Sequence, residues 1–387
     1  MRVCVIYDCL YPYTVGGAER WYRNLAQRLA EEGHEVTYLT LRQWDRGEQG
    51  TIPGVRVVTA GPRMALYVDA RRRILPPLVF GAGVLWHLLR HGRRYDVVHT
   101  ASFPYFSLLA AALARTLGRF AIVVDWHEVW SAHYWRDYLG AGRGRIGHAV
   151  QRLCARVPQT AFTFSRLYAA RLREEGLPNE ATVLEGEYEG DLGPPRVLPA
   201  KPVVMFAGRL IPEKRAPAAV HAMRAAADRI PGLRGEVFGQ GPQDAEVRAA
   251  IDGDDRVAAL GFVVGDQFDA HMRRALCVLA PSSREGYGLV VVEASARGVP
   301  AIVVAGEDNA AVELIEDGVN GYVAQSADPE VLADAVERVH AAGGALRQST
   351  ADWFTLNAVR LSLASSLERV VEAYRDGDSP AGPSTRR

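Results

Sequence analysis

The sequence predicts an α/β protein built on two parallel β-sheets. A chain of 387 residues is long for one hydrophobic core and comfortable for two. Apolar strand-like runs alternate with amphipathic helical patterns along the whole chain, which is the pattern of βαβ units. Between residues 190 and 202, four prolines and two glycines interrupt this series. We therefore expect two Rossmann-like domains joined by a short linker, with a ligand cleft between them.

The N-terminal domain is expected to span residues 1–190. A helical pattern over Ala18–Glu32, with Leu25 and Leu29 on one face, follows the first strand. The expected strands are Val3–Tyr7, Glu35–Thr40, Val55–Thr59, Val97–His99, Ala121–Val124, Ala161–Phe164 and Thr182–Leu184.

The C-terminal domain is expected to span residues 202–352. A last helical pattern over 353–375 follows it. The expected strands are Val203–Ala207, Gly235–Phe238, Val257–Leu260, Cys277–Leu279, Ala301–Val304 and Tyr322–Ala324.

Composition excludes some classes of protein. The formal net charge is zero, so nucleic acid is not an expected partner, although residues 1–190 carry 24 Arg and no Lys against 18 Asp and Glu. Four cysteines lie far apart without metal-ligand spacing, and Asp8 breaks the first apolar run, which argues against a signal peptide. We expect a cytoplasmic protein with reduced thiols and no metal site.

One apolar window, Leu75–Leu89, raises the question of membrane contact. It contains two prolines and is too short to span a bilayer. Arg71, Arg72 and Arg73 precede it. A core helix with a solvated basic flank is the favoured interpretation, and peripheral contact of the N-terminal domain with the inner face of the membrane stays open.

The most informative motif is a pair of glutamates eight positions apart that bracket a glycine turn. The glycines allow a tight turn close to a ligand, and the helix that opens after them presents free N–H groups suited to a phosphate. A carboxylate on either side can accept hydrogen bonds from sugar hydroxyls. The expected donor-contacting residues are Glu285, Gly286, Tyr287, Gly288, Leu289, Val290 and Glu293.

A second motif lies upstream, where the strand Val203–Ala207 ends at Gly208. Arg209 and Lys214 follow at the carboxyl end of that strand, where ligands of parallel sheets bind. Two cations there can hold the two phosphates of a diphosphate. A diphosphate flanked by hydroxyl-binding carboxylates describes a nucleotide sugar.

The two motifs, in this order and spacing, resemble retaining glycosyltransferases of family 4, which have the GT-B fold. The resemblance covers residues 1–375 and implies that the helix at 353–375 crosses back onto the N-terminal domain. It implies a nucleoside diphosphate sugar as donor, a hydroxyl acceptor and no required cofactor.

The resemblance also assigns residues outside the two motifs. The loop with Gly16 and Gly17 would face the donor diphosphate, although a plain turn before a helix also explains it. His127 would lie beside the reacting sugar, and Gly241 and Phe262 would flank the nucleobase. The aromatic residues after His127 suit an acceptor wall or a lid packed on the core equally well.

The resemblance further implies front-face attack, in which Arg209 and Lys214 neutralise the departing diphosphate. Glu285 would hold the donor sugar and Glu293 the ribose. A GT-B sugar phosphorylase, a nucleotide-sugar epimerase and an inactive sugar-binding subunit remain alternatives. Residues 184–188, Leu-Glu-Gly-Glu-Tyr, depart from the family pattern and put the usual role of that loop in doubt.

Overall fold

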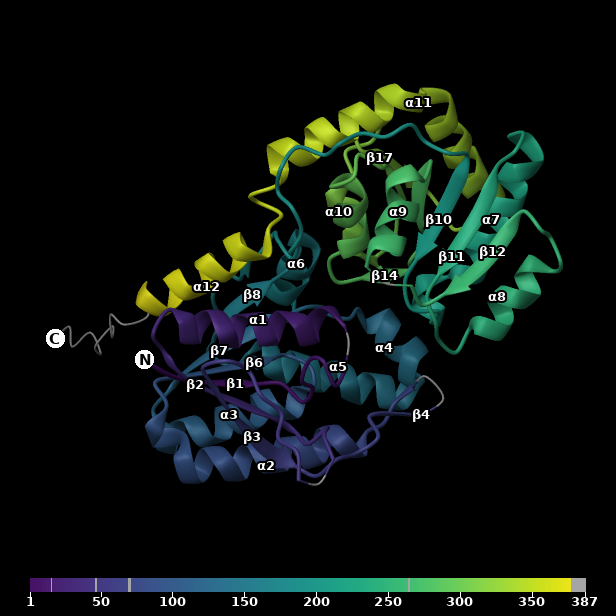
Figure 1. The fold of residues 1–387 in the computed structure, drawn as a ribbon. Helices are drawn as coiled ribbons and strands as arrows, with labels where there is room; N and C mark the ends of the chain where they lie inside the picture. The colour runs from purple at the N-terminus through teal and green to yellow at the C-terminus, as the bar shows by residue number, and fades with distance from the viewer. Residues whose placement is uncertain (15, 46, 69–70, 264, 377–387) are drawn as a thin grey trace.

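The computed structural model describes residues 1–376 apart from 15, 46, 69, 70 and 264. Two α/β domains lie against each other, and the last helix returns from the C-terminal domain to the N-terminal one (Figure 1). The expected fold class is confirmed. Every strand predicted from the sequence is present, with its ends within two residues of the expected ones.

The N-terminal domain contains a seven-stranded parallel sheet of order β3-β2-β1-β6-β7-β8-β9. Helix α1 packs on one face of this sheet, and α2 and α3 pack on the other (Figure 1). The strands are β1 Arg2–Ile6, β2 Glu35–Leu41, β3 Val55–Gly61, β6 Val97–Ala101, β7 Ala121–Trp126, β8 Thr160–Thr163 and β9 Thr182–Val183. The helices are α1 Gly17–Glu31, α2 Leu75–His91, η1 Gly92–Arg94, α3 Tyr105–Gly118, α4 Ala132–Leu139, α5 Ala141–Ala155 and α6 Arg166–Glu174.

The C-terminal domain repeats this design with a six-stranded parallel sheet of order β12-β11-β10-β13-β15-β17. The strands are β10 Val203–Ala207, β11 Arg234–Phe238, β12 Val257–Gly261, β13 Cys277–Ala280, β15 Ala301–Val304 and β17 Gly321–Ala324. The helices are η2 Pro212–Lys214, α7 Ala216–Arg229, α8 Asp244–Ile251, α9 Asp266–Arg274, α10 Leu289–Ser295 and η3 Ala310–Leu314. Residues 190–202, the predicted linker, contain no helix or strand.

Two short strand pairs were not predicted. Strands β4, Tyr67–Val68, and β5, Arg71–Arg72, form a small antiparallel pair. Strands β14, Arg284–Glu285, and β16, Asp308–Asn309, form a parallel pair next to the cleft. Two-residue strands leave no periodicity in a sequence, so only the structure reveals them.

The single helix predicted over 353–375 is wrong in its extent. Residue 353 belongs to α11, Pro329–Asn357, and a separate helix, α12, covers Leu363–Asp376. Between them the chain pairs with Tyr188, whose N–H donates to the carbonyl of Leu361 at 3.0 Å and whose carbonyl accepts from Leu363 at 2.9 Å. These tertiary hydrogen bonds replace helical ones, which explains a break inside a continuous helical pattern.

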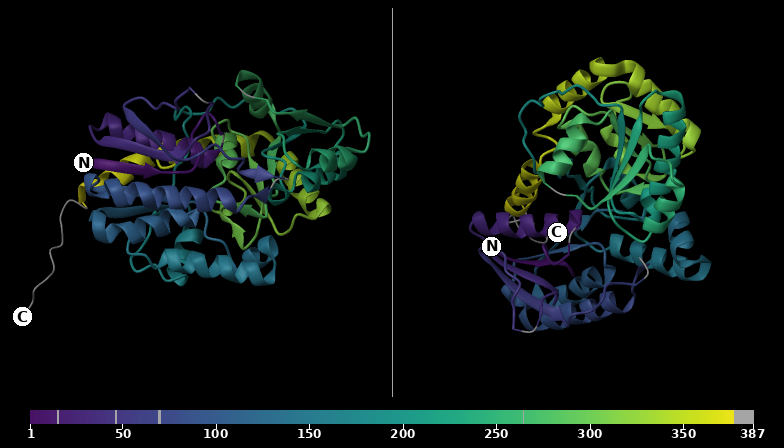
Figure 2. Two further views of the ribbon diagram at one scale, coloured as in Figure 1. Left: turned by 90° about the horizontal axis from the view of Figure 1, so that it is seen from below. Right: turned by 45° about the vertical axis from the view of Figure 1, so that its right-hand side comes forward.

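Helix α12 reaches the N-terminal domain, as the family resemblance implied. It lies beside α1 in both views of Figure 2 and in Figure 1. At its end the hydroxyl of Tyr374 lies 2.6 Å from Nδ1 of His99, and both side chains are buried. The last helix is therefore fixed to the centre of the N-terminal sheet.

His99 extends this contact into a buried polar network. Its Nε2 lies 2.9 Å from Oδ1 of Asp125, and the indole N–H of Trp21 donates to Oδ2 of Asp125 at 2.7 Å. Burial favours the neutral acid, but His99 and Trp21 outweigh it and hold the pKa of Asp125 below its ordinary value. The network links α1, β6, β7 and α12.

Replacing Tyr374 by Phe removes the hydroxyl and leaves Nδ1 of His99 buried without that partner. We expect the free energy of unfolding to fall by about 1–3 kcal/mol, the usual cost of an unsatisfied buried polar group. Chemical denaturation of Tyr374→Phe beside Tyr13→Phe, a control at an exposed tyrosine, measures this. Equal stability of the two variants would contradict a structural role for the bond.

Candidate functional site

The two predicted cations follow β10, and one of them is already paired. Nζ of Lys214 forms an ion pair with Oε1 of Glu285. The hydroxyl of Ser282 donates to the same oxygen at 2.8 Å. The side chain of Arg209 is exposed and forms no ion pair within the described chain. Lys214 of one motif and Glu285 of the other therefore contact each other, whereas Arg209 forms no ion pair among the described residues.

The glycine turn after Glu285 lies where the two domains touch. A Cβ on Gly286 would lie 2.7 Å from the carbonyl oxygen of His127, so any larger residue would push the domains apart. Gly288 has a φ of +105°, and a Cβ there would lie 2.6 Å from Cβ of Ala311. Both positions require glycine. Helix α10 begins at Leu289, as the sequence predicted.

His127 follows β7 and is held by aromatic contacts. Its ring stacks on Phe164 with a centroid distance of 4.3 Å and meets the edge of Tyr22 at 5.8 Å. Burial lowers its pKa to about 4, so the ring is neutral at physiological pH. Its Nε2 is buried without a hydrogen-bond partner among the described residues. A neutral ring nitrogen is therefore left without a hydrogen-bond partner next to the predicted site.

Glu187 is a site residue that the sequence did not reveal. Its Oε1 lies 3.9 Å from Nδ1 of His127. Burial, reinforced by the negative charges of Asp125 and Glu285, raises its pKa to about 8. Glu187 belongs to the segment that departs from the family pattern, and that departure was the one signal that could have identified it.

A cavity of about 140 Å³ lies between α1 and α10 and connects several predicted residues. Burial raises the pKa of Glu293 within it. The residues that line it include Gly17 of the first loop, Leu289 and Glu293 of the motif of paired glutamates, Glu187, and the cations Arg20 and Arg297. Residues from the first loop, the motif of paired glutamates and the segment around Glu187 thus meet in one place.

Three other predicted residues, Gly208, Gly241 and Phe262, belong to loops at the ends of β10, β11 and β12. Gly208 and Gly241 belong to adjacent loops, because a Cβ on Gly241 would lie 2.4 Å from the carbonyl oxygen of Leu210. Phe262 is 64% exposed in the loop after β12, which joins the loop after β11 through the hydrogen bond from Gly239 to Gly261 at 2.8 Å.

Three further predicted residues have contacts within the protein itself. The buried hydroxyl of Tyr287 donates to the carbonyl of Glu185 at 2.8 Å, so it links the domains. Gly16 precedes α1, and a Cβ there would meet the carboxylate of Glu19. Val290 is half-buried in the first turn of α10 and packs on the core.

The aromatic residues after His127 belong to the interface between the domains. Arg284 forms ion pairs with Glu128 and, at 3.6 Å, with Glu213. Its guanidinium lies over the rings of Trp130 at 4.9 Å and Tyr134 at 4.5 Å. These rings therefore pack against a cation of the opposite domain in this structure.

The described residues contain no group of three or more His, Cys, Asp or Glu side chains placed to hold a metal ion. Nor does any helix in the described parts of the chain combine the length and apolarity that crossing a bilayer requires.

The raised pKa of Glu187 predicts a specific pH dependence of stability. Between its ordinary pKa and about 8, the unfolded chain ionises this carboxyl while the folded chain must keep it protonated, so wild-type stability falls as pH rises. Glu187→Gln mimics the neutral acid and lacks this cost. We expect the variant to be more stable than wild type by about 2–4 kcal/mol at pH 8 and nearly equal to it at pH 4.5.

Thermal and chemical denaturation of Glu187→Gln across this pH range measure the difference. Glu189→Gln, whose exposed side chain bonds Asn24, is the matched control and should show no such trend. A pH-independent difference for Glu187→Gln would contradict a neutral carboxyl in the folded state.

The chain is similar to known proteins along most of its length. Residues 16–185 match the family model "Glycosyl transferase 4-like domain", and residues 201–342 match "Glycosyl transferases group 1". Among curated proteins, the D-inositol 3-phosphate glycosyltransferase of Actinosynnema mirum is 30% identical over 92% of this chain and 90% of its own length. An exopolysaccharide phosphotransferase of Streptomyces coelicolor is 34% identical, but the match covers 37% of this chain and only 15% of that protein.

Solved structures agree on the fold. Sucrose-phosphate synthase from Thermosynechococcus elongatus superposes with a TM-score of 0.79 at 21% identity, over 97% of this chain and 98% of its own. HepE from Anabaena, solved in complex with UDP, superposes with a TM-score of 0.72 at 18% identity, over 97% of this chain and 100% of its own. This chain belongs to the group 1 glycosyltransferases and has their GT-B fold.

Proposed function

We propose that this glycosyltransferase moves a hexose from a nucleoside diphosphate sugar to an acceptor hydroxyl, with retention of the anomeric configuration. The observation that carries the proposal is the grouping of Arg209, Lys214 and Glu285 at the carboxyl ends of the C-terminal strands. Glu293 lies on the other side of the glycine turn, in the cavity that also contains Gly17.

The two cations are assigned to the diphosphate. Arg209 forms no close ion pair within the described chain, although its charge helps to lower the pKa of Glu213, so binding an anion breaks no existing ion pair. Lys214 shares its charge with Glu285, and an arriving phosphate can accept from the remaining donors of the ammonium. Charge that develops on the leaving diphosphate would be stabilised by these two residues, helped by the free N–H groups that follow Gly288.

The carboxylates are assigned to hydroxyl groups. Glu285 is fixed by Lys214 and Ser282, which aligns its second oxygen for the donor sugar. Glu293 faces the cavity beside Arg20 and is assigned to the ribose. The unpartnered Nε2 of His127 is assigned to a hydroxyl of the transferred sugar.

We assign front-face attack, in which the leaving phosphate oxygen takes the proton of the acceptor hydroxyl. Double displacement would need an ionised carboxylate as nucleophile. Two carboxyls lie near His127: Asp125 is buried and held by His99 and Trp21, and the raised pKa of Glu187 keeps it protonated at neutral pH. A neutral carboxyl is a poor nucleophile, which supports the single-step route, and no cofactor is assigned to either step.

The first donors to test are UDP-sugars, because HepE has been solved with UDP and with UDP-glucose. The first acceptors to test are polyol phosphates, because full-length relatives at 25–30% identity are named D-inositol 3-phosphate glycosyltransferases. Soluble metabolites and lipid-linked glycans that carry hydroxyl groups extend the acceptor panel.

The chain offers a matched pair of variants for the transfer reaction, since it contains only two lysines. Lys214→Ala should lower kcat/KM for the donor by about 100-fold, the typical effect of removing one charge-stabilising contact, or roughly 3 kcal/mol. Lys201→Ala, at an exposed residue in the linker, should leave it unchanged.

Donor turnover measures the rate, and proton NMR of the product reports its anomeric configuration. A product with inverted configuration would overturn retention. Equal kcat/KM for Lys214→Ala and Lys201→Ala would remove the proposed diphosphate site.

We also propose that the N-terminal domain contacts an anionic membrane surface. Residues 73–119 contain six arginines and one acidic residue, Asp96. Helices α2, α3 and α5 expose large apolar side chains among these cations: Ile74, Leu75, Leu78, Trp86, Leu89, Leu113, Leu117, Ile146 and Leu153. Apolar side chains surrounded by basic residues suit an anionic bilayer.

Co-sedimentation with vesicles tests this contact. Wild type should bind phosphatidylglycerol vesicles and not pure phosphatidylcholine ones. Leu113→Glu, which places a negative charge on α3, should weaken that binding severalfold because it opposes both insertion and attraction. Leu356→Glu, at an 86% exposed leucine of α11, is the control. Equal binding of the two variants would contradict a contact through this face.

A further inference from the structure

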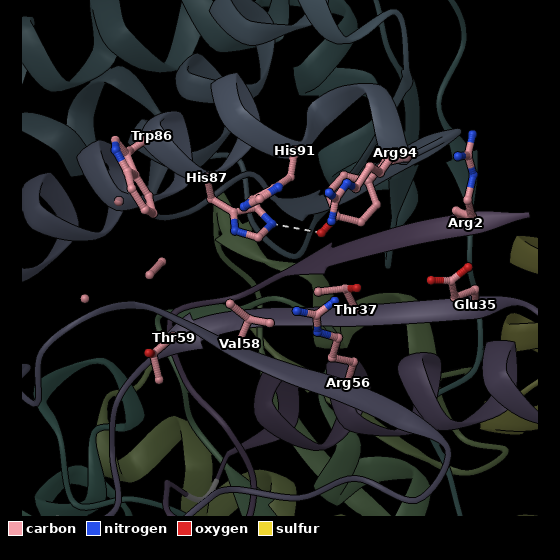
Figure 3. A pocket seen from close by; sticks show the side chains of 14 residues that line it. Arg2, Glu35, Thr37, Arg56, Val58, Thr59, Trp86, His87, His91 and Arg94 are labelled. Carbon is pink, nitrogen blue, oxygen red and sulfur yellow. Dashed lines mark hydrogen bonds between the residues drawn. The ribbon is translucent and has the colours of Figure 1, made fainter.

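A second cavity lies in the N-terminal domain, apart from every residue predicted for the donor site. Its volume is about 630 Å³, within the range of small-molecule sites. It lies between the sheet face formed by β1, β2 and β3 and the end of α2 with η1 (Figure 3). One end is closed by tight packing of α2 on β3, because a Cβ on Gly83 would overlap the carbonyl of Ala60.

Positive charge gathers in the part of this cavity next to α2 and η1, whereas its one lining carboxylate, Glu35, lies beside Arg2. Arg56 extends from β3 toward the helix that carries His91, and Arg94 follows on η1 (Figure 3). Neither Arg56 nor Arg94 forms an ion pair within the described chain. By contrast, Arg2 at the far end of the cavity pairs with Asp96 at 2.7 Å.

The histidines of the cavity respond to these charges. Burial, then His91 and Arg56, lowers the pKa of His87 to about 4. Burial, then the arginines around it, also lowers the pKa of His91. Nε2 of His87 contacts the hydroxyl of Tyr95 at 2.8 Å, whereas Nδ1 of His91 is buried without a partner among the described residues. The cavity is therefore lined by cationic groups and by His91, one ring nitrogen of which has no partner among the described residues.

The other residues that line the cavity indicate which kind of ligand would fit it. Val58, Ala60 and the 61% exposed ring of Trp86 form an apolar side next to the cations. Glu35 lies near Arg2 at the end of the cavity opposite Trp86, with Arg56 and Arg94 between the two ends (Figure 3). A ligand with one anionic end and one small apolar end fits this division. Two guanidinium forks suit a phosphate dianion in particular.

We propose that this cavity binds a phosphate monoester whose phosphate lies between Arg56, Arg94 and His91 and whose apolar group lies against Trp86. The site is separate from the donor cleft and does not depend on the transfer reaction assigned above. The phosphate could be carried by a soluble molecule or by a lipid headgroup, since α2 also borders the basic and apolar face described above.

Isothermal titration with phenyl phosphate tests the site. Wild type should bind it, and the double variant Arg56→Ala/Arg94→Ala should bind it at least about tenfold more weakly, because two charge-assisted contacts are lost. Arg93→Ala, beside Arg94 but outside the cavity, should keep wild-type affinity. Lys214→Ala should also keep it, which separates this site from the donor cleft.

Two binding experiments distinguish a soluble phosphate monoester from a lipid headgroup. Glycerol 3-phosphate is the soluble probe, and vesicles containing phosphatidic acid, compared with phosphatidylserine at equal mole fraction, are the lipid probe. If the double variant, with an unchanged circular dichroism spectrum, no longer binds glycerol 3-phosphate, the site takes a soluble phosphate monoester. If it no longer binds the phosphatidic acid vesicles, the site takes a lipid headgroup. Equal affinity of wild type and the double variant for both probes would overturn the proposal.

Discussion

The arrangement of the two domains depends on the contacts that the guanidinium of Arg284 makes between them. It reaches from the C-terminal domain to Glu128 and to the rings of Trp130 and Tyr134, while Glu213 of its own domain balances it. Side chains alternate along a strand, so the two-residue strand β14 directs Arg284 to the interface and the next residue, Glu285, to Lys214. One short strand therefore couples the domain interface to the proposed donor site.

A second contact fixes the same arrangement from the other side of the molecule. Tyr374 of α12 bonds His99 at the centre of the N-terminal sheet, and His99 lies against Asp125 at the end of β7. His127 leaves that same strand two residues later. The helix that returns from the C-terminal domain thus supports the strand from which the proposed sugar contact begins.

The sequence was sufficient for the architecture, whereas the roles predicted for the residues of the two motifs stay predictions. Strands buried on both faces read as short apolar runs, which is why β10 and β15 were predicted with their exact ends. Gly286 and Gly288 were predicted to allow a tight turn close to a ligand, and the structure shows that each lies close to another part of the protein, His127 and Ala311, which a side chain would strike. These features depend on residues close together in the sequence and on the order of the strands and helices, so they could be predicted.

What the sequence could not supply depends on contacts between distant residues. The break between α11 and α12 arises from pairing with Tyr188, and helical periodicity continues through it. Glu187 becomes a site residue only because it folds next to His127, and its pKa depends on burial. The cavity around Arg56 and Arg94 joins a strand and a helical turn that no sequence motif connects.

In the proposed donor site, a nucleoside diphosphate lies between Arg209 and Lys214. A crystal structure of the enzyme with bound UDP is the decisive experiment. We expect both phosphates within hydrogen-bond distance of these two cations and the ribose hydroxyls against Glu293. UDP bound with its phosphates away from both cations would contradict the assignment of the donor site.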